Sequence, residues 1–434
     1  MSVQVRRSCA IELNGTAVAR ARPGAFRSFG ESTVRVFVFD WLAYGENVDK
    51  FRVNGEMPRL GRSQFNPQAA VDTYAQHLQA WVELERQGFD GIAINEHHAT
   101  PYGLGNSPNL IAAAIAMMTR ALKILIYANL LPLHEPLRLA EELAMLDCLS
   151  NGRLIAGVGR GAPREYKIFN VPMAESRARF EECFEIMRRA WVEESFSFEG
   201  RFHSYRDVSI WPRPVQRPHP PVWVPATGSR ETIEWAAAND IAITPGVFAG
   251  PVREDSIRHY ARCQARYGRK VTPDRLNVMI DCYVADSKAK AVEEYGPYLL
   301  YLFNTLLTYG QVLQKDVQAG YYSSTAFEHL RMGSKGTLAE DSTIFTEWTM
   351  DTLRAAAENM PIGTPDEVTE RIIAECDEAG AQSVLLVCNR GHMPQEMFLN
   401  QIRRIGTEVL PKLQAHTVRR VPFAEDVRLA DAHA

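Results

Sequence analysis

Short apolar runs alternate with longer stretches of helical periodicity along most of the chain. The short runs are rich in aliphatic and β-branched residues, and the stretches between them repeat apolar positions three or four residues apart. This order predicts parallel strands joined by helical crossovers, because parallel neighbours need a long connection. Eight such units predict a closed (β/α)₈ TIM barrel of the α/β class. The expected strands are residues 33–39, 90–95, 122–128, 153–158, 222–226, 240–244, 276–284 and 382–388.

Capping residues mark the ends of the expected helices. Asn66 and Pro67 form a cap and first-turn pair, and Gly88 ends the helix that they begin. Thr364 and Glu367 form a capping box before another helix. The apolar residues expected to share the buried face of the first helix are Val71, Tyr74, Leu78, Trp81 and Val82.

Two irregular stretches interrupt the alternation. Residues 45–66 follow the first expected strand, and residues 310–345 separate the seventh from the eighth. In a barrel both insertions lie over the C-terminal mouth, where active sites form. We expect them to cover the substrate. A surface insertion without a role is an equal alternative for the second stretch.

Composition and charge narrow the class of protein. Of the 434 residues 46% are hydrophobic and 23% charged, which is typical of a soluble globular protein with a large core. The 48 basic and 52 acidic residues nearly balance, so a small-molecule partner is expected rather than nucleic acid or a membrane. Seven scattered cysteines indicate reduced thiols in the cytoplasm, and no apolar run reaches the roughly 18 residues that cross a bilayer.

The beginning of the chain differs from the rest in being rich in arginine and poor in acidic residues. No long apolar core follows, so a signal peptide is excluded. A disordered extension or a misplaced start codon is favoured over a transit peptide. We therefore expect an extension at residues 1–30, a single barrel domain at 31–415 and a C-terminal tail at 416–434.

The sequence Asn95-Glu96-His97-His98 lies where the second strand is expected to end. Strand ends on this face direct titratable groups at a ligand, and histidine is the side chain most easily poised near neutral pH. His97 is therefore the candidate catalytic residue. Strand alternation sends His97 and His98 to opposite sides, so no metal site is predicted. The alternative is that both imidazoles only cap the strand end.

A candidate anion site follows the fourth and fifth strands. Arg160, flanked by glycines at 157–161, is able to bind a phosphate bidentately, and Arg177 is within reach of the same anion. Ser229 and Thr232 open a helix whose N-terminus favours negative charge. The alternatives are a surface salt bridge for Arg177 and a plain helix cap for Ser229.

Together these groups predict an organic phosphate whose body extends toward the second and third strand ends. His97 lies there, and residues 127–129 are placed to line the plane of a ring system. Barrels more often bind phosphate after strands seven and eight. A site after strands four and five therefore indicates a specific family.

These chained motifs resemble the bacterial luciferase-like monooxygenases. The resemblance is strong over residues 33–250 and weaker over 360–413. The matching segments are residues 96–98, 102–108, 131–142, 146–154, 157–161, 175–177, 229–235, 363–365 and 392–394.

The resemblance implies an enzyme that uses reduced FMN, delivered by a separate NAD(P)H:flavin reductase, and O₂ to oxygenate a small organic substrate by hydroxylation or a Baeyer–Villiger reaction. His97 matches the family's catalytic acid or base, and a homodimer is implied. The bond between Tyr127 and Ala128 matches a non-proline cis peptide. Gly159 stands where luciferase has a cysteine, which argues against light emission. The residues expected to bind FMN are Tyr127, Ala128, Asn129, Arg160, Arg177, Thr227, Gly228, Ser229 and Thr232.

The substrate itself is not identified by the sequence. Aromatic residues near the strand ends suggest an apolar pocket wall, although aromatic side chains are more often core. The residues expected to bind substrate are Trp41, Tyr44, Glu96, His98 and Tyr321. Three alternatives stay open: hydride transfer with the deazaflavin F420 on the same fold, a flavin-binding protein without turnover, and a structural barrel without a cofactor.

Overall fold

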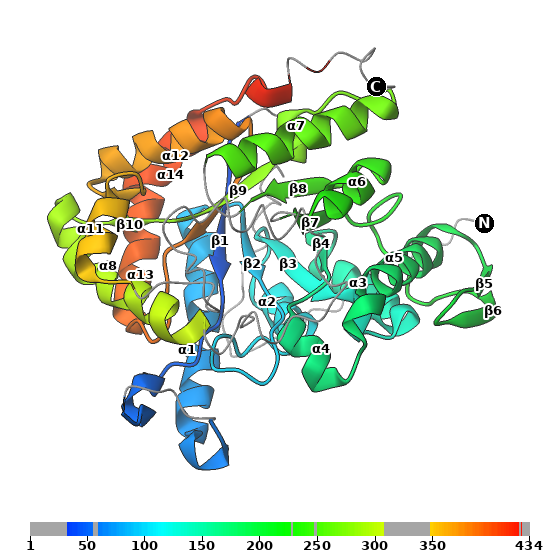
Figure 1. The fold of residues 1–434 in the computed structure, drawn as a ribbon, viewed down its shortest axis with the longest axis horizontal. Coiled ribbons are helices and arrows are strands. Elements are labelled where there is room, and N and C mark those ends of the chain that lie inside the picture. The colour runs from blue at the N-terminus through cyan, green and yellow to red at the C-terminus, as the bar shows by residue number, and fades with distance from the viewer. Residues whose placement is uncertain are drawn as a thin grey trace, which may run out of the picture.

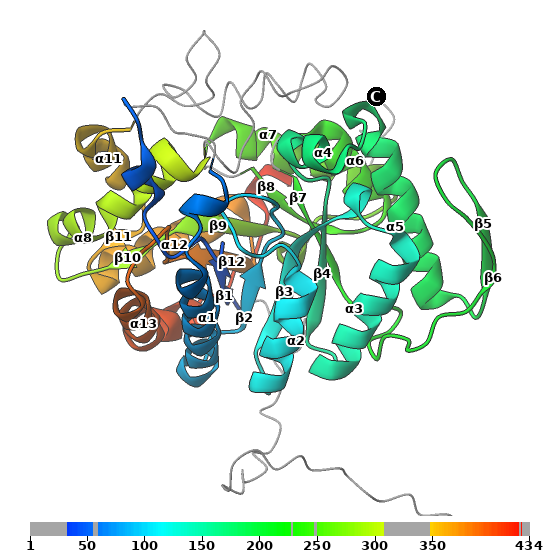
Figure 2. The same ribbon diagram turned by 90° about the horizontal axis from the view of Figure 1, so that it is seen from below.

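Eight parallel strands form a nearly closed barrel around which the helices are arranged (Figure 1, Figure 2). The computed structural model describes residues 33–54, 60–226, 229–246, 250–307, 348–424 and 427. Neighbouring strands follow the order β8-β7-β4-β3-β2-β1-β12-β9, and a parallel bridge between Ile243 and Leu276 joins the two ends. The barrel strands are β1 Arg35–Asp40, β2 Gly91–Ile94, β3 Lys123–Leu130, β4 Leu154–Gly159, β7 Val222–Ala226, β8 Ala242–Pro245, β9 Asn277–Asp281 and β12 Ser383–Val387.

The predicted barrel is therefore confirmed, and each barrel strand falls on an expected one. Helices cover the outside of the sheet (Figure 2). They are α1 Pro67–Gln87, α2 Pro108–Met118, α3 Pro136–Ser150, α4 Pro163–Phe169, α5 Ser176–Val192, α6 Arg230–Ala238, α7 Pro251–Arg266, α8 Lys288–Tyr301, α11 Met350–Ala357, α12 Pro365–Ala379, α13 Gln395–Arg404 and α14 Leu410–Ala415.

The predicted ends of α1 are confirmed, but its predicted buried face is wrong in part. Asn66 caps the helix and Gly88 ends it in the left-handed conformation, at φ 83°. Val71 is 59% exposed, whereas His77 is buried. His77 Nδ1 lies 2.6 Å from Asp40 Oδ2 at the end of β1. This polar pairing turns His77 inward, because a buried carboxylate has to be paired.

The interior of the barrel is filled by one face of the strands. Because side chains alternate along a strand, the other face packs against the helices. A Cβ added to Gly157 would lie 1.9 Å from the carbonyl oxygen of Ile126, so β3 and β4 approach closely only with glycine there. The interior cluster consists of Phe37, Phe39, Ala93, Leu125, Tyr127, Ile155, Trp223, Ala242, Leu385 and Val387.

Two short β structures lie outside the barrel. The sequence analysis did not anticipate the antiparallel hairpin of β5 Phe196–Glu199 and β6 Ser204–Val208, which projects from the barrel (Figure 2). The strand expected at 276–284 ends at Asp281. Its last part, β10 Tyr283–Val284, leaves the barrel and pairs with β11 Ile362–Gly363.

The two expected insertions are described to different extents. The first contains the short 3₁₀ helices Val48–Phe51 and Arg62–Gln64, and residues 310–345 lie outside the described residues. At the other end, Val418 and Val421 are buried, and Thr417 bridges to Thr33. Among the described residues no helix combines the length and apolarity that crossing a membrane requires.

Candidate active site

His97 follows β2 at the mouth of the barrel and is held by a buried carboxylate. Its Nδ1 lies 2.9 Å from Glu165 Oε1, and the Glu165 side chain is 2% exposed. The other carboxylate oxygen accepts the backbone N–H of Ala162 at 2.7 Å. In a neutral imidazole, Nδ1–H donating to Glu165 leaves Nε2 as the acceptor. Asn106 fixes the backbone by donating to the carbonyl oxygen of His97 at 2.7 Å.

Sequence reasoning missed Glu165, which is 68 positions from His97. The available signal was its place in the first turn of α4, after Pro163, where an acidic residue caps the helix. That pattern predicts a cap and does not indicate which side chain the second oxygen meets. The pairing depends on how close the loop after β4 comes to the end of β2.

His98 and Glu96 form a separate network on the other side of the strand end. His98 Nε2 lies 2.9 Å from Glu96 Oε1, and His134 Nε2 lies 2.8 Å from Glu96 Oε2. Burial alone would raise the pKa of Glu96, but the hydrogen bonds from His134 and His98 lower it to about 2. Glu96, His98 and His134 line a cavity of about 240 Å³. Their predicted contact with substrate stays a prediction.

The structure brings four of the predicted phosphate-binding residues together. Arg177 Nη2 donates to Thr232 Oγ1 at 2.8 Å and to Ser229 Oγ at 3.3 Å. Arg160 Nη1 donates to Ser176 Oγ at 3.4 Å. These side chains come from the loop after β4, from α5 and from the N-terminus of α6. The expected convergence on one place is therefore present.

Two carboxylates lie near this cluster, because Glu231 accepts a hydrogen bond from Ser229 Oγ at 2.9 Å and Glu181 lies on the same helix as Arg177. Burial, together with the nearby charge of Arg160, lowers the pKa of Arg177 to about 10. Arg177 Nη1 is buried and has no partner among the described residues. Ser229 also caps α6, so the helix cap that was the alternative for Ser229 is present. Glu181 lies 3.8 Å from Arg177 at the surface, which is the salt bridge that was the alternative for Arg177. The unused N–H and the helix N-terminus both fit a phosphate.

The bond between Tyr127 and Ala128 is a non-proline cis peptide, as the resemblance implied. The Tyr127 hydroxyl bonds to that of Thr244. A Cβ on Gly159 would lie 3.2 Å from the Cβ of Ala128, so a larger residue there would crowd this peptide. Asn129 donates from Nδ2 to Glu96 at 3.3 Å, and therefore belongs to the network of Glu96. The predicted residues Thr227, Gly228 and Tyr321 lie outside the described residues.

Of the predicted substrate-binding aromatic residues, Trp41 lies at the mouth and Tyr44 packs into a satellite cluster. The Trp41 ring is 6.0 Å from that of Tyr102, which is 4.8 Å from the ring of His97. Tyr44 stacks on Phe65 at 6.0 Å, and its hydroxyl accepts the backbone N–H of Asn66. Tyr44 thus ties the loop after β1 to the start of α1, and its predicted contact with substrate stays a prediction.

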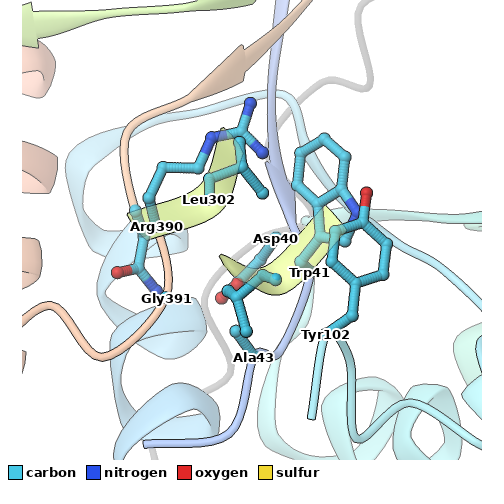
Figure 3. A pocket seen from close by; sticks show the side chains of 9 residues that line it. Asp40, Trp41, Ala43, Tyr102, Leu302, Arg390 and Gly391 are labelled. Carbon is cyan, nitrogen blue, oxygen red and sulfur yellow. The ribbon is translucent and has the colours of Figure 1, made fainter. Parts of the chain in front are cut away.

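Arg390 and Asp281 are two further site residues that sequence reasoning missed. Arg390, which Figure 3 shows beside Trp41, follows β12. It donates from Nε and Nη2 to both carboxylate oxygens of Asp281, each at 2.8 Å. The signal was similar to that of Arg160, an arginine beside a glycine shortly after a strand, because Arg390 comes three residues after the end of β12. Asp281 ends β9, 109 positions away, so only barrel closure reveals the pair.

A group with metal-ligand chemistry lies away from the mouth. Glu234 on α6 and His259 and Cys263 on α7 bring one ligand atom each within 4.8 Å of one another. Burial lowers the pKa of His259 and raises that of Cys263. No local sequence pattern indicates this group, because its members come from two helices.

The parallel barrel, with a carboxylate-held histidine and a cluster of arginine and hydroxyl side chains at the C-terminal ends of its strands, has the architecture of the TIM-barrel enzymes. Within that class, the chain belongs to the luciferase-like monooxygenase family, whose model matches residues 56–383. It is therefore an oxidoreductase of the monooxygenase class.

Two similar proteins are also named as monooxygenases. The oxygenase component of the flavin-dependent trigonelline monooxygenase of Acinetobacter baylyi is 24% identical, over 86% of this chain and 97% of the relative. The monooxygenase RslO1 of Streptomyces bottropensis is 26% identical, with a TM-score of 0.65, over 87% of this chain and 99% of that structure.

More distant solved structures share the fold. The oxygenating constituent of 3,6-diketocamphane monooxygenase from Pseudomonas putida, solved with FMN, is 20% identical with a TM-score of 0.66, over 88% of this chain and 99% of that one. An F420-dependent secondary alcohol dehydrogenase is 15% identical with a TM-score of 0.58, over 88% of this chain and 99% of that one. The fold is thus shared by proteins with different cofactors.

Proposed function

We propose that the chain is the oxygenase component of a two-component monooxygenase that uses reduced FMN and O₂ to oxygenate a small organic substrate. The observation that carries the proposal is the buried Arg177 Nη1, because a phosphate oxygen would supply the acceptor that this nitrogen lacks among the described residues. The name of the trigonelline relative, an oxygenase component, supports a separate NAD(P)H:flavin reductase as partner.

The described residues suit the two ends of FMN. Arg160, Arg177, Ser229 and Thr232 would hold its phosphate, and the ring would lie toward the mouth between the cis peptide and His97. Reduced FMN supplies the electrons that activate O₂ when it is bound.

His97 is the group that would hold or move a proton. Glu165 keeps its Nδ1 occupied, so proton exchange with a ligand falls to Nε2. The apolar barrel interior below excludes water from the reacting atoms. The hydroxylation and Baeyer–Villiger alternatives both need such a group.

Hydride transfer with F420 is the second candidate function, supported by the shared fold of the alcohol dehydrogenase. FMN is favoured by the resemblance of Glu96-His97-His98 and the loop that follows them to the luciferase-like monooxygenases. In that loop Asn106 fixes the His97 backbone at 2.7 Å. A flavin-binding protein without turnover is disfavoured, because a buried carboxylate that orients a histidine is typical of catalytic sites.

A cytoplasmic homodimer is part of the proposal. Neighbouring helices α2 and α3 expose a group of large apolar side chains, with Leu110 74% exposed. Such a patch is typical of a subunit interface. Its members are Leu110, Met117, Met118, Met145 and Leu149. Sedimentation at several concentrations tests this state, and a monomer throughout would contradict it.

The phosphate cluster is tested by comparing reduced FMN with reduced riboflavin, which lacks the phosphate. Under anaerobic conditions the wild type is expected to bind FMN at least ~10-fold more tightly, as for a charge-assisted hydrogen-bond pair. Arg177→Gln should remove most of this difference. Arg188→Gln, on the same helix and paired with Glu185 at the surface, is the matched control. Equal binding of both flavins by the wild type would refute the proposed site.

Turnover completes the test of the proposed function. Reduced FMN and O₂, added with candidate substrates, should give an oxygenated product that carries one atom of ¹⁸O from labelled O₂. A product without label, together with reduction of F420 by an alcohol, would instead establish the hydride-transfer alternative.

A further inference from the structure

Glu234, His259 and Cys263 form a compact group where two outer helices meet. Helices α6 and α7 pack against each other (Figure 1). His259 and Cys263 are four residues apart on α7, so their side chains share one face of that helix, and Glu234 reaches them from α6. One ligand atom of each residue lies within 4.8 Å of the other two. The packing of two helices thus assembles three side chains of the kinds that bind transition metals.

The distances around His259 are close to those that a tetrahedral ion imposes on its ligands. His259 Nε2 lies 3.1 Å from Glu234 Oε1 and 3.8 Å from Cys263 Sγ. Zinc binds nitrogen and carboxylate oxygen at about 2.0–2.2 Å and thiolate sulfur at about 2.3 Å. With tetrahedral angles, these bond lengths place nitrogen about 3.4 Å from oxygen and about 3.6 Å from sulfur. Small side-chain rotations would therefore bring the three atoms onto one ion.

The contacts of His259 are a poor arrangement for hydrogen bonding alone. The Glu234 oxygen and the Cys263 sulfur both approach the same ring nitrogen. In a neutral imidazole this nitrogen carries either a proton or a lone pair. With a proton it donates to the carboxylate, and with a lone pair it accepts from the thiol, so one of the two contacts stays weak. A metal ion between the three atoms would be bound by a lone pair from each of them.

Burial prepares two of the ligands and leaves the third open to solvent. Cys263 is 2% exposed, and the side chains of His259 and Glu234 are 12% and 49% exposed. Burial lowers the pKa of His259, which favours the neutral imidazole that binds metals. Burial raises the pKa of the Cys263 thiol, so a bound metal has to displace the thiol proton into solvent. The exposed side at Glu234 gives water access to a fourth coordination position.

The charges around the group are compatible with a divalent cation. The Glu234 carboxylate and the Cys263 thiolate together balance two positive charges. The arginines whose charge acts on Cys263 are Arg230, Arg262 and Arg266. Arg230 is paired with Asp255 at 3.0 Å, and the other two are exposed, where solvent and salt screen their charge. Repulsion from these arginines is therefore reduced.

We propose that Glu234, His259 and Cys263 bind one Zn²⁺ ion through a carboxylate oxygen, Nε2 and Sγ, with water as the fourth ligand. A thiolate combined with an imidazole favours zinc over the hard cations Mg²⁺ and Ca²⁺. The ion would join α6 to α7. The inference does not rest on the proposed function, because the group lies away from the mouth and takes no part in holding FMN.

Co²⁺ is a suitable probe, because it accepts the same tetrahedral ligands and its bond to a thiolate gives a charge-transfer absorption that d¹⁰ Zn²⁺ lacks. The full chain, freed of metal with a chelator, is titrated with Co²⁺. The wild type should bind one equivalent with this absorption. An excess of Zn²⁺ should then remove the absorption by displacing Co²⁺ from the same ligands.

Substitutions of the three ligands identify the site. Glu234→Gln, His259→Gln and Cys263→Ser should each weaken Co²⁺ binding at least ~10-fold, and Cys263→Ser should also abolish the charge-transfer absorption. Glu234→Gln changes an exposed side chain and keeps its size, so this variant is expected to fold. Cys148→Ser, which removes an exposed thiol on α3, is the matched control and should bind Co²⁺ as the wild type does.

Three results would overturn the proposal. Wild-type protein that binds neither Co²⁺ nor Zn²⁺ would leave a surface ion pair between Glu234 and His259. Binding without the charge-transfer absorption would place the metal on surface carboxylates or imidazoles. A folded Cys263→Ser or Glu234→Gln variant with wild-type affinity would place it on other ligands. None of these measurements involves flavin, so their outcome is independent of the comparison between FMN and riboflavin.

Discussion

Replacing Glu165 with glutamine tests whether the carboxylate positions His97. The substitution preserves shape and removes the charge at a side chain that is 2% exposed. The single oxygen of the amide is still able to accept the N–H of Ala162, which the carboxylate now accepts at 2.7 Å, and the NH₂ group then faces His97. The bond at risk is the 2.9 Å contact with His97 Nδ1.

The expected magnitude follows from that single bond. A hydrogen bond to a charged group is worth about 1.5–3 kcal/mol, which corresponds to roughly a 10- to 100-fold change in rate if it is realised in the transition state. An amide that turns its NH₂ toward Nδ1 would also favour the wrong tautomer of His97. Turnover should therefore fall by that factor.

The assay measures two quantities on the same variant. Stopped-flow mixing of the reduced-FMN complex with O₂ and substrate gives turnover, and anaerobic titration gives the Kd for FMN. Turnover should fall while the Kd stays within about twofold. Glu185→Gln, which removes a carboxylate paired with Arg188 at the surface of α5, is the control. A variant with wild-type turnover, or one whose loss is entirely in FMN affinity, would refute the positioning role.

Two further predictions concern the same strand end. His97→Ala should bind FMN normally and lose at least ~100-fold in turnover, as expected on removing a general acid or base, and unchanged turnover would leave His97 a structural cap. Glu96 should contribute stability that depends on pH. Its pKa of about 2 in the folded protein lies below its ordinary value of 4.5, so the contribution is present above pH 4.5 and is lost as the pH falls toward 2. The shift corresponds to about 3 kcal/mol. Urea unfolding of the wild type and of Glu96→Gln at pH 7 and pH 3 should show the gap between them narrowing at low pH; a constant gap would contradict the assigned cause.

Local patterns were enough to predict much of the barrel and the identity of several site residues. Strand positions and helix ends depend on alternation, caps and glycines within a few residues, so the ends of α1 and the strand before His97 follow from the sequence. The cations of the phosphate cluster were found because each follows a strand or opens a helix. Their convergence followed from the rule that parallel strand ends meet at one mouth.

The tertiary structure decided which side chains meet across that mouth. Glu165 reaches His97 over 68 positions, and Asp281 reaches Arg390 over 109. The buried face of α1 was likewise set by the pairing of His77 with Asp40. Such contacts depend on strand stagger and loop path, which no local periodicity encodes. The sequence by itself therefore determined the barrel, the histidine and the anion cluster, whereas closure of the barrel decided how the histidine is oriented and which buried cation is already neutralised.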